Sequence, residues 1–403
     1  MSRMLACTFV LLAAARAPAA AKLPPPTREH AFVVMPPGRR SDGLRRHPFY
    51  GYVITPHAVV DGGVVYCAYQ NGRGQPMVAS YDMAEKTPAG PVRASTFGLG
   101  GDDHGNPSLY VDRKGYLHVF YGCHAGAMRH TRSVKPRDIT KWQEQRPPTP
   151  RATYPQSMRL SDGTACLFYR AGGHTAPWTL RTSTDDCQTW SQGARIIEMR
   201  VKPRDPRAAA YCAFRPGADG KTIHCFWNFK DDNPRRRPKA YPKLHEAVYR
   251  YNMYYVRRDP DGVWRTGAGE PVSLPVSKAE ADAKCMVYDS GKAFAYPGRI
   301  AVDSKDRPHI KLSTGVRDWR KGRRVVVPMR FKYAALADGA WVVRDGLPDE
   351  WSAEAKTVIN GRGLEAFGDR SRGRWFIFYR YLPDNNVGIF LYHEATGYAA
   401  RQK

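Results

Sequence analysis

The chain has 403 residues, with 63 Lys and Arg against 37 Asp and Glu, so its formal net charge is +26. This length suffices for one large core or two ordinary domains, and because no Pro/Gly/Ser-rich linker divides it, we expect one closed domain. The charge indicates a polyanionic partner. The lack of a long apolar stretch beyond the N-terminus argues against a membrane-spanning protein.

Residues 1–21 have the composition of a secretory signal peptide. One Arg precedes an apolar run from Met4 to Ala15, and small residues lead to an A-x-A-like cleavage site near Ala19–Ala21. We therefore expect residues 22–403 to be secreted, into the periplasm or the medium, as a monomeric propeller domain without a membrane partner. Because the chain is exported and shows no nucleic-acid-binding motif, an anionic polysaccharide is a better partner than nucleic acid.

A short strand, a turn and a more apolar strand recur along the chain at roughly 45-residue spacing. Turns such as Asp61-Gly62 and Asp162-Gly163 suit tight hairpins, because Gly tolerates positive φ and Asp bonds its own backbone. The repeats begin at Val53, His104, Tyr154, Tyr211, Tyr296 and Leu364.

The regular period favours an all-β β-propeller over a β-sandwich or a β-helix. We expect seven blades, the seventh built from residues 28–50, residues 272–292 and the C-terminal end, with six blades as the alternative. The segment Ser183 to Trp190 matches the Asp-box pattern S-x-D-x-G-x-T-W, with Cys187 in place of Gly, and Arg257 to Trp264 is a weaker match. Such turns are folding elements rather than sites.

The cysteines leave two readings open. Cys212 and Cys225 are symmetric about a turn and could form a disulfide in an oxidising compartment. Equally, cysteines in apolar strands serve as small buried side chains. No C-x-x-C spacing supports a zinc site, although a structural zinc or calcium ion stays open; the candidate ligands are Cys212, Cys225, His224, His245 and Cys285.

In a propeller, the first strand of each blade lines the central axis, so residues at the starts of these strands gather at one mouth of the channel. The repeat alignment places His104, Tyr154, Tyr211 and Tyr296 at such starts. The matching ends of the following strands carry Arg170, Asn228 and Arg380, and His124 lies two residues beyond that position. Together these residues combine proton-transfer groups with a cation suited to a carboxylate.

The spacing of His104 and His124, followed by Tyr154 and Arg170, resembles that of the seven-bladed propeller polysaccharide lyases that include ulvan lyases. The stretch from Tyr254 to Val276 is similar to the matching blade of the broader neuraminidase-like repeat family, and the resemblance extends over most of the mature chain. It implies cleavage of a uronic-acid-containing polysaccharide by β-elimination, with no cofactor required for catalysis.

Elimination at a uronic acid needs a cation on the carboxylate, a base for the C-5 hydrogen and an acid for the leaving oxygen at C-4. Arg170 suits the first task, because its guanidinium binds a carboxylate with two hydrogen bonds. His104 or Tyr154 is the candidate base, Tyr154 the candidate acid, and His124 is expected to orient the sugar. The expected substrate-binding residues are Tyr211, Asn106, Arg380 and Asn228.

Three other functions are weighed against this one. A sialidase would need an arginine triad, which Phe214 to Gly217 (FRPG) matches only superficially. A two-carboxylate glycosidase would depend on Asp102 and Asp103. The third is a non-catalytic carbohydrate-binding propeller. Among these, only a lyase generates an ultraviolet-absorbing unsaturated uronate, so absorbance separates the alternatives.

Overall fold

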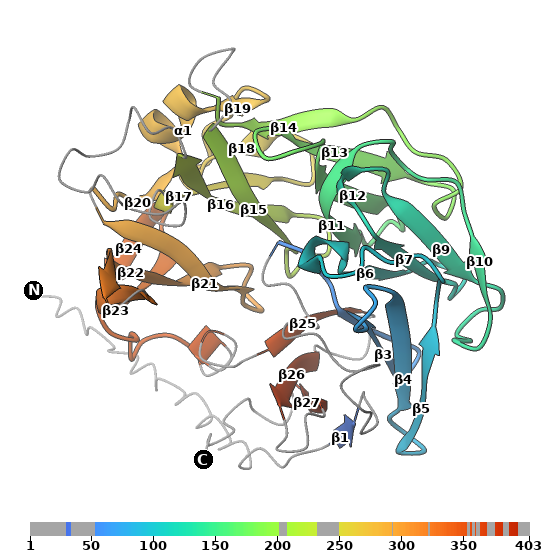
Figure 1. The fold of residues 1–403 in the computed structure, drawn as a ribbon. Helices are drawn as coiled ribbons and strands as arrows, with labels where there is room; N and C mark the ends of the chain where they lie inside the picture. The colour runs from blue at the N-terminus through green and yellow to red at the C-terminus, as the bar shows by residue number, and fades with distance from the viewer. Residues whose placement is uncertain are drawn as a thin grey trace, which may run out of the picture.

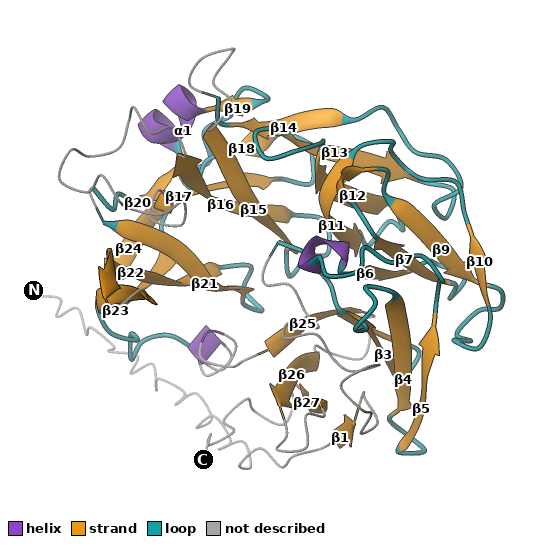
Figure 2. Cartoon of the chain, viewed as in Figure 1, coloured by secondary structure: helices purple, strands orange, loops and turns teal. Residues whose placement is uncertain are grey.

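The computed structural model describes residues 30–33, 53–200, 208–231, 250–291, 293–320, 323–352, 355–356, 359, 363–368, 375–381 and 387–393. Antiparallel strands dominate this part of the chain, and the sheets follow one another around a common centre in chain order (Figure 1, Figure 2). The prediction of an all-β fold is confirmed. The signal-peptide segment 1–21 and His245 lie outside the described residues.

The first sheet joins the two ends of the chain. Its order is β1-β27-β26-β25-β2-β3-β4-β5, and β1 pairs antiparallel with β27 while β2 pairs parallel with β25. The strands are β1 (His30–Val33), β2 (Ala58–Asp61), β3 (Val64–Gln70), β4 (Pro76–Asp82), β5 (Thr87–Arg93), β25 (Gly363–Gly368), β26 (Trp375–Tyr381) and β27 (Val387–His393).

The next two sheets carry most of the candidate site. One has the order β10-β9-β7-β6, and the other has the order β19-β14-β13-β12-β11-β8. Their strands are β6 (Ser108–Val111), β7 (Leu117–Tyr121), β8 (His124–Gly126), β9 (Arg129–Ser133), β10 (Trp142–Glu144), β11 (Ala152–Arg159), β12 (Ala165–Arg170), β13 (Trp178–Ser183), β14 (Ala194–Glu198) and β19 (Val276–Ser277). A 3₁₀ turn, η1 (Asp103–Gly105), precedes β6.

Two further sheets complete the described part. One has the order β15-β16-β17-β18, with β20 also paired to β17, and the other has the order β21-β22-β23-β24. Their strands are β15 (Ala208–Pro216), β16 (Ile223–Asp231), β17 (Arg250–Arg258), β18 (Trp264–Arg265), β20 (Met286–Tyr288), β21 (Phe294–Val302), β22 (Pro308–Arg320), β23 (Arg323–Ala337) and β24 (Ala340–Arg344). The helix α1 (Lys278–Lys284) lies between β19 and β20.

The segments proposed for a seventh blade are distributed among other sheets. β1 joins the sheet of β25 to β27, while β19 and β20 from residues 272–292 extend the sheets of β14 and β17. This occurs because each short segment finds unpaired backbone groups at an existing sheet edge. The number of blades therefore stays a prediction. In the described part, no helix has the length and apolarity that a membrane crossing requires.

The predicted turn chemistry is present. Gly163 and Gly220 have φ values of 88° and 71°, and the Asp219 carboxylate accepts hydrogen bonds of 2.8 Å from the backbone N–H groups of Lys221 and Thr222. In the Asp box, Asp185 accepts from the Thr189 N–H at 2.9 Å, and Cys187 has a φ of 64°. The positive φ explains why glycine is the usual residue at that position of the pattern.

Buried polar side chains bind neighbouring first strands to one another. The Gln156 amide of β11 donates to the Cys212 carbonyl of β15 at 2.9 Å and accepts from the Phe214 N–H at 3.0 Å. The hydroxyl groups of Ser108 and Ser157 lie 2.8 Å apart between β6 and β11. These bonds hold β6, β11 and β15 side by side, so residues at their starts lie close together.

All seven cysteines from Cys67 to Cys285 are buried and free. Cys212 and Cys225 are therefore not joined in a disulfide, and the interpretation as small buried side chains describes the structure. Burial raises the pKa of the Cys166 thiol to about 12, which keeps this thiol protonated and unreactive.

The core between the sheets of β11 and β15 depends on stacked aromatic rings. Phe168 and Phe214 are fully buried, with ring centroids 3.9 Å apart and planes at 11°. We expect Phe168→Ala to lower the free energy of unfolding by about 3–5 kcal/mol, because the cavity adds to the lost transfer free energy. Urea unfolding followed by tryptophan fluorescence measures this. Phe331→Ala is the control: its side chain is 42% exposed, so the free energy of unfolding should fall by less than about 1 kcal/mol. Equal decreases in the two variants would show that burial of the Phe168 ring does not stabilise the core.

His57, just before β2, makes stability depend on pH. Burial lowers its pKa from 6.5 to about 3, against the opposing backbone contacts with Ala68 and Pro107. Below pH 6.5 His57 is protonated in the unfolded chain, whereas in the folded chain it stays neutral until the pH falls to about 3. As the pH is lowered from 6.5 to about 3, the free energy of unfolding should therefore decrease, by up to about 1.4 kcal/mol per pH unit from this group. His57→Gln should show a shallower slope in urea unfolding at a series of pH values, and identical slopes would refute the assignment.

Candidate active site

A 3₁₀ turn positions His104 at the start of β6. Asp102 caps this turn, because its carboxylate accepts the backbone N–H of His104 at 3.0 Å. The same carboxylate accepts the imidazole Nδ1–H of His104 at 2.5 Å. Asp102 thus holds both the backbone and the imidazole of His104, whose side chain remains 22% exposed.

A short added strand positions His124. β8 pairs with the edge of β11, with Thr153 opposite His124. The Thr153 hydroxyl accepts the Ala125 N–H at 2.9 Å, and Ala125 has a φ of 61°. This sharp turn brings the His124 imidazole over that of His104: the ring centroids lie 3.8 Å apart with planes at 9°.

A β-bulge positions Tyr154. The pairing of β11 with β12 shifts register between Thr153 and Gln156, and Tyr154 has a φ of 63°, which a bulky residue rarely adopts. Bulges re-aim side chains and gather at functional sites. Here the ring packs parallel to that of Trp178 with centroids 6.1 Å apart, and the hydroxyl lies 2.9 Å from His104 Nε2.

Arg170, the last residue of β12, brings a buried positive charge to the same place. Its side chain is 2% exposed, and no described residue offers a hydrogen-bond partner to its Nε or Nη1 atom. The guanidinium carbon lies 4.7 Å from the ring centroid of Tyr154 and 5.6 Å from that of Tyr211. Because buried polar groups are normally bonded, these unsatisfied donors indicate a site for an anionic ligand.

Tyr211 of β15 lies among three cations. The guanidinium of Arg250 is 3.8 Å from its ring centroid, and the ammonium of Lys230 is 5.7 Å away. Burial alone would raise the pKa of Tyr211, but the charges of Arg250, Lys230 and Arg170 and a bond with Tyr154 lower it. Arg250 also lies 5.1 Å from the ring of Tyr296. The cluster adds to the local preference for anions.

The remaining predicted residues have different surroundings. Asn106 is fully buried and donates to the Asp103 carbonyl at 3.0 Å, and Asn228 is fully buried and donates to the Ala295 carbonyl at 3.1 Å. Arg380 belongs to β26, but its side chain falls outside the described part of the chain. The substrate-binding role of these three residues stays a prediction.

Asp102 is the main residue that sequence reasoning missed as a partner of the histidines. Its second oxygen accepts the Nδ1–H of His124 at 2.6 Å. Burial would raise the pKa of Asp102, but the bonds from His104 and His124 lower it to about 2. Burial in turn lowers the pKa of His104, with the charge of His124 adding to this and Asp102 opposing it. The signal in the sequence was the acidic pair directly before His104.

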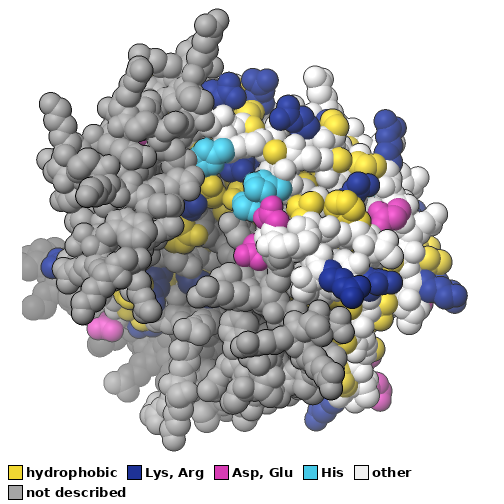
Figure 3. All heavy atoms as spheres, in the orientation of Figure 1, with side chains coloured by type: hydrophobic (Ala, Val, Ile, Leu, Met, Phe, Trp, Pro, Cys, Tyr) yellow, Lys and Arg dark blue, Asp and Glu magenta, His cyan; other side chains and the backbone are white. Residues whose placement is uncertain are grey.

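Asp102, His104 and His124 also form the one cluster in the described residues whose ligand atoms could together hold a metal ion. Both carboxylate oxygens already accept imidazole N–H groups, however, so the set is satisfied by hydrogen bonds alone. Figure 3 shows histidine and acidic side chains side by side near the middle of the face that it presents.

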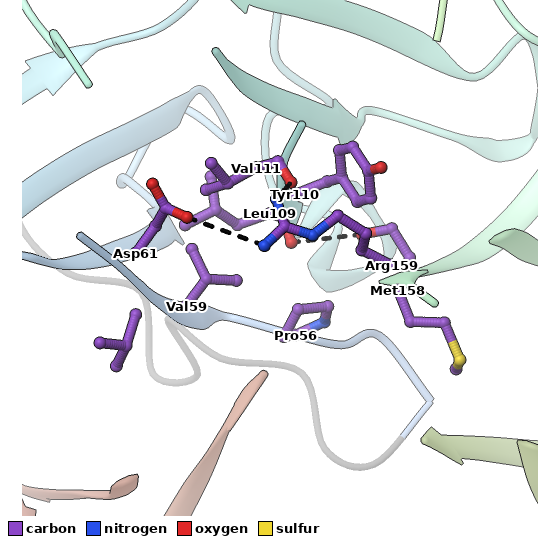
Figure 4. Close-up of a pocket in the computed structure, with 10 residues that line it drawn as sticks. Pro56, Val59, Asp61, Leu109, Tyr110, Val111, Met158 and Arg159 are labelled. Atoms are coloured by element: carbon purple, nitrogen blue, oxygen red, sulfur yellow. Dashed lines mark hydrogen bonds and ion pairs between the residues drawn. The ribbon is translucent and has the colours of Figure 1, made fainter. Parts of the chain in front are cut away.

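A second feature lies at the opposite ends of the first strands. A cavity of about 50 Å³ is lined by residues of β2, β6 and β11, among them Val59, Val111 and Arg159 (Figure 4). Arg159 donates to the Val111 and Asp112 carbonyls at 3.1 and 2.8 Å, so the cationic group at its wall is already bonded. His104 and Tyr154 meet at the other ends of these strands.

Comparison with known proteins places this arrangement in a family. The model described as "BNR repeat-containing family member" matches residues 64–346. The chain belongs to this BNR repeat-containing family. Family membership agrees with the recurring strand and Asp-box pattern.

Relatives of this BNR repeat chain include proteins that are named ulvan lyases. It is 28% identical over 292 residues to an ulvan lyase of Alteromonas sp. (strain LOR), covering 66% of this chain and 59% of that protein. It is 26% identical over 322 residues to an ulvan lyase of Pseudoalteromonas sp. (strain PLSV), covering 73% and 64%. The matches thus span less than two thirds of each relative's own length. They confirm the resemblance to ulvan lyases seen in the sequence.

Solved structures share the fold of this BNR repeat chain. A polysaccharide lyase, an ulvan lyase bound to -[GlcA(1-4)Rha3S]-, superposes with a TM-score of 0.68 at 23% identity, covering 87% of this chain and 82% of that one. The polysaccharide lyase Uly1 superposes with a TM-score of 0.61 at 13% identity, covering 92% and 98%. At these identities the likeness concerns the fold.

Proposed function

We propose that this protein is a secreted polysaccharide lyase that cleaves a uronic-acid-containing anionic polysaccharide, of the ulvan or rhamnosyl-glucuronate type, by β-elimination on a β-propeller scaffold. The observation that carries this proposal is the buried guanidinium of Arg170, two of whose nitrogen atoms find no partner among the described residues, beside the Tyr154–His104 hydrogen bond. Elimination needs a cation that can bind the carboxylate and an acid–base pair beside that cation, and Arg170 with Tyr154 and His104 supplies both. The net charge of +26 and the named activity of the relatives support the same substrate class.

Each group has one task in this proposal. Arg170 binds the uronate carboxylate and neutralises its charge, which makes the adjacent C-5 hydrogen acidic enough to remove. Tyr154 protonates the leaving oxygen at C-4, and either Tyr154 or His104 removes the C-5 hydrogen; each such group contributes on the order of 10²–10⁴-fold. His124 orients the sugar, and Tyr211 borders the site. The scheme uses only side chains of this chain.

A substrate screen tests the proposal. Purified protein is incubated with ulvan, glucuronan, pectin and a heparinoid, and the ultraviolet absorbance of unsaturated uronate is followed. We expect a steady rise with at least one uronate polymer. Calorimetric binding of a polymer without any rise would instead support the non-catalytic carbohydrate-binding alternative, and release of sialic acid would support the sialidase.

A further inference from the structure

One carboxylate organises both histidines of the candidate site. Asp102 Oδ1 accepts the backbone N–H and the Nδ1–H of His104, at 3.0 and 2.5 Å, and Oδ2 accepts the Nδ1–H of His124 at 2.6 Å. An ionised carboxylate can only accept hydrogen bonds. Both imidazoles must therefore carry a proton on Nδ1, and a neutral ring then has its lone pair on Nε2.

This proton placement decides the direction of the next bond. His104 Nε2 lies 2.9 Å from the Tyr154 hydroxyl. Since a neutral His104 can only accept at Nε2, the Tyr154 O–H donates to it. The guanidinium of Arg170, 4.7 Å from the Tyr154 ring centroid, favours negative charge on that ring. Asp102, His104 and Tyr154 thus form a continuous proton path into the site.

We propose that Asp102 is a positioning residue that fixes the tautomer and orientation of both imidazoles, so that His104 withdraws the Tyr154 proton while Tyr154 removes the C-5 hydrogen of the sugar. The proposal rests on the lyase function proposed above and assigns the base. The logic is that of a carboxylate that holds a catalytic imidazole in the correct tautomer and stabilises its protonated form.

The proton balance closes within this set. The Tyr154 O–H proton moves to His104 Nε2 as the C-5 proton moves to the Tyr154 oxygen. The C-5–H electron pair forms the C-4–C-5 double bond, and the C-4–O bond breaks. Tyr154 then gives its proton to the leaving oxygen and recovers one from His104. The net result is transfer of one proton from C-5 to the glycosidic oxygen, with no oxidant or reductant involved.

The stacked rings separate the roles of the two histidines. With ring centroids 3.8 Å apart, two positively charged imidazoles would repel each other strongly. His124 acts in this scheme as a support that stacks on His104 and bonds the other oxygen of Asp102, with a side chain that is 44% exposed.

The test replaces Asp102 by Asn in the full chain. The amide oxygen takes the place of only one of the two carboxylate oxygens, and the amide nitrogen in the other place donates, so at least one imidazole must change tautomer or turn away. We expect the ¹⁵N imidazole spectrum, assigned with a His104→Gln variant, to show a changed tautomer. We expect kcat to fall by about 10²-fold or more with KM little changed. Asp103→Asn is the matched control, since it removes the neighbouring charge without touching the Asp102–histidine bonds.

A purely structural role would lower the melting temperature without altering the tautomer of the folded protein. Imidazole ¹⁵N chemical shifts that are unchanged at both rings in Asp102→Asn overturn the proposal, because they exclude a new tautomer and a broken bond alike. Full turnover by that variant, when the wild type is active, overturns it as well. If the wild type forms no unsaturated uronate from any polymer, the lyase function itself is wrong. The tautomer comparison still decides whether Asp102 fixes the imidazoles, because it needs no substrate.

Discussion

Tyr154→Phe should lower kcat by about 10²-fold or more while leaving the fold intact. The change removes only the hydroxyl that bonds His104 Nε2 at 2.9 Å, so the ring keeps its packing against Trp178. Loss of the hydrogen bonds to His104 and Tyr211 should change the free energy of unfolding by about 1–2 kcal/mol. Initial rates of unsaturated uronate formation and a thermal melt measure the two quantities.

Tyr296→Phe is the matched control for that experiment. Tyr296 lies at the corresponding start of β21 and contacts Arg250, but it is not bonded to His104 in the described contacts. Its loss of a hydroxyl should therefore have a much smaller effect on kcat. Near-full turnover by Tyr154→Phe would place the acid–base pair elsewhere.

Replacing Arg170 should separate activity from stability. In Arg170→Met, the carboxylate of the substrate loses its counter-charge, and turnover should fall below detection. Because Arg170 is buried with two nitrogen atoms unpartnered among the described residues, removing its charge should leave the melting temperature unchanged or raise it. Arg170→Lys keeps the charge but loses the paired donors, so we expect kcat/KM to fall by about 10²-fold or more.

Arg215→Met provides the contrast. Arg215 is also buried, but it donates to the Phe214 carbonyl at 2.9 Å. Its removal should lower the melting temperature without a direct effect on the chemistry. If Arg170→Met destabilised the protein as strongly as Arg215→Met and retained turnover, Arg170 would be a structural cation.

The sequence predicts the repeat and the gathering of the site, because both depend on local patterns. Asp-Gly turns mark the hairpins, and residues at equivalent strand starts meet since the first strands lie side by side. His104, His124, Tyr154, Arg170 and Tyr211 accordingly lie together.

Features that depend on register and burial were not predictable in the same way. The bulge that gives Tyr154 a φ of 63° and the added strand that carries His124 leave no periodic mark. Asn106 and Asn228 each donate one amide hydrogen bond to a backbone carbonyl, a contact that depends on local packing and that the repeat pattern does not indicate. Arg250 and Lys230 reach Tyr211 from β17 and β16, neighbouring strands of the same sheet, so this contact depends on the register of three strands.

The mass of the cleavage product tests the central claim most directly. Elimination adds no water across the broken bond, whereas hydrolysis adds one molecule. Mass spectrometry of a limit digest of the substrate should therefore show oligosaccharides that are each lighter by one water than the corresponding hydrolysis products, with an unsaturated uronate at the non-reducing end. Products with the mass of hydrolysis products would contradict the lyase mechanism, provided that the Tyr154→Phe variant does not form them.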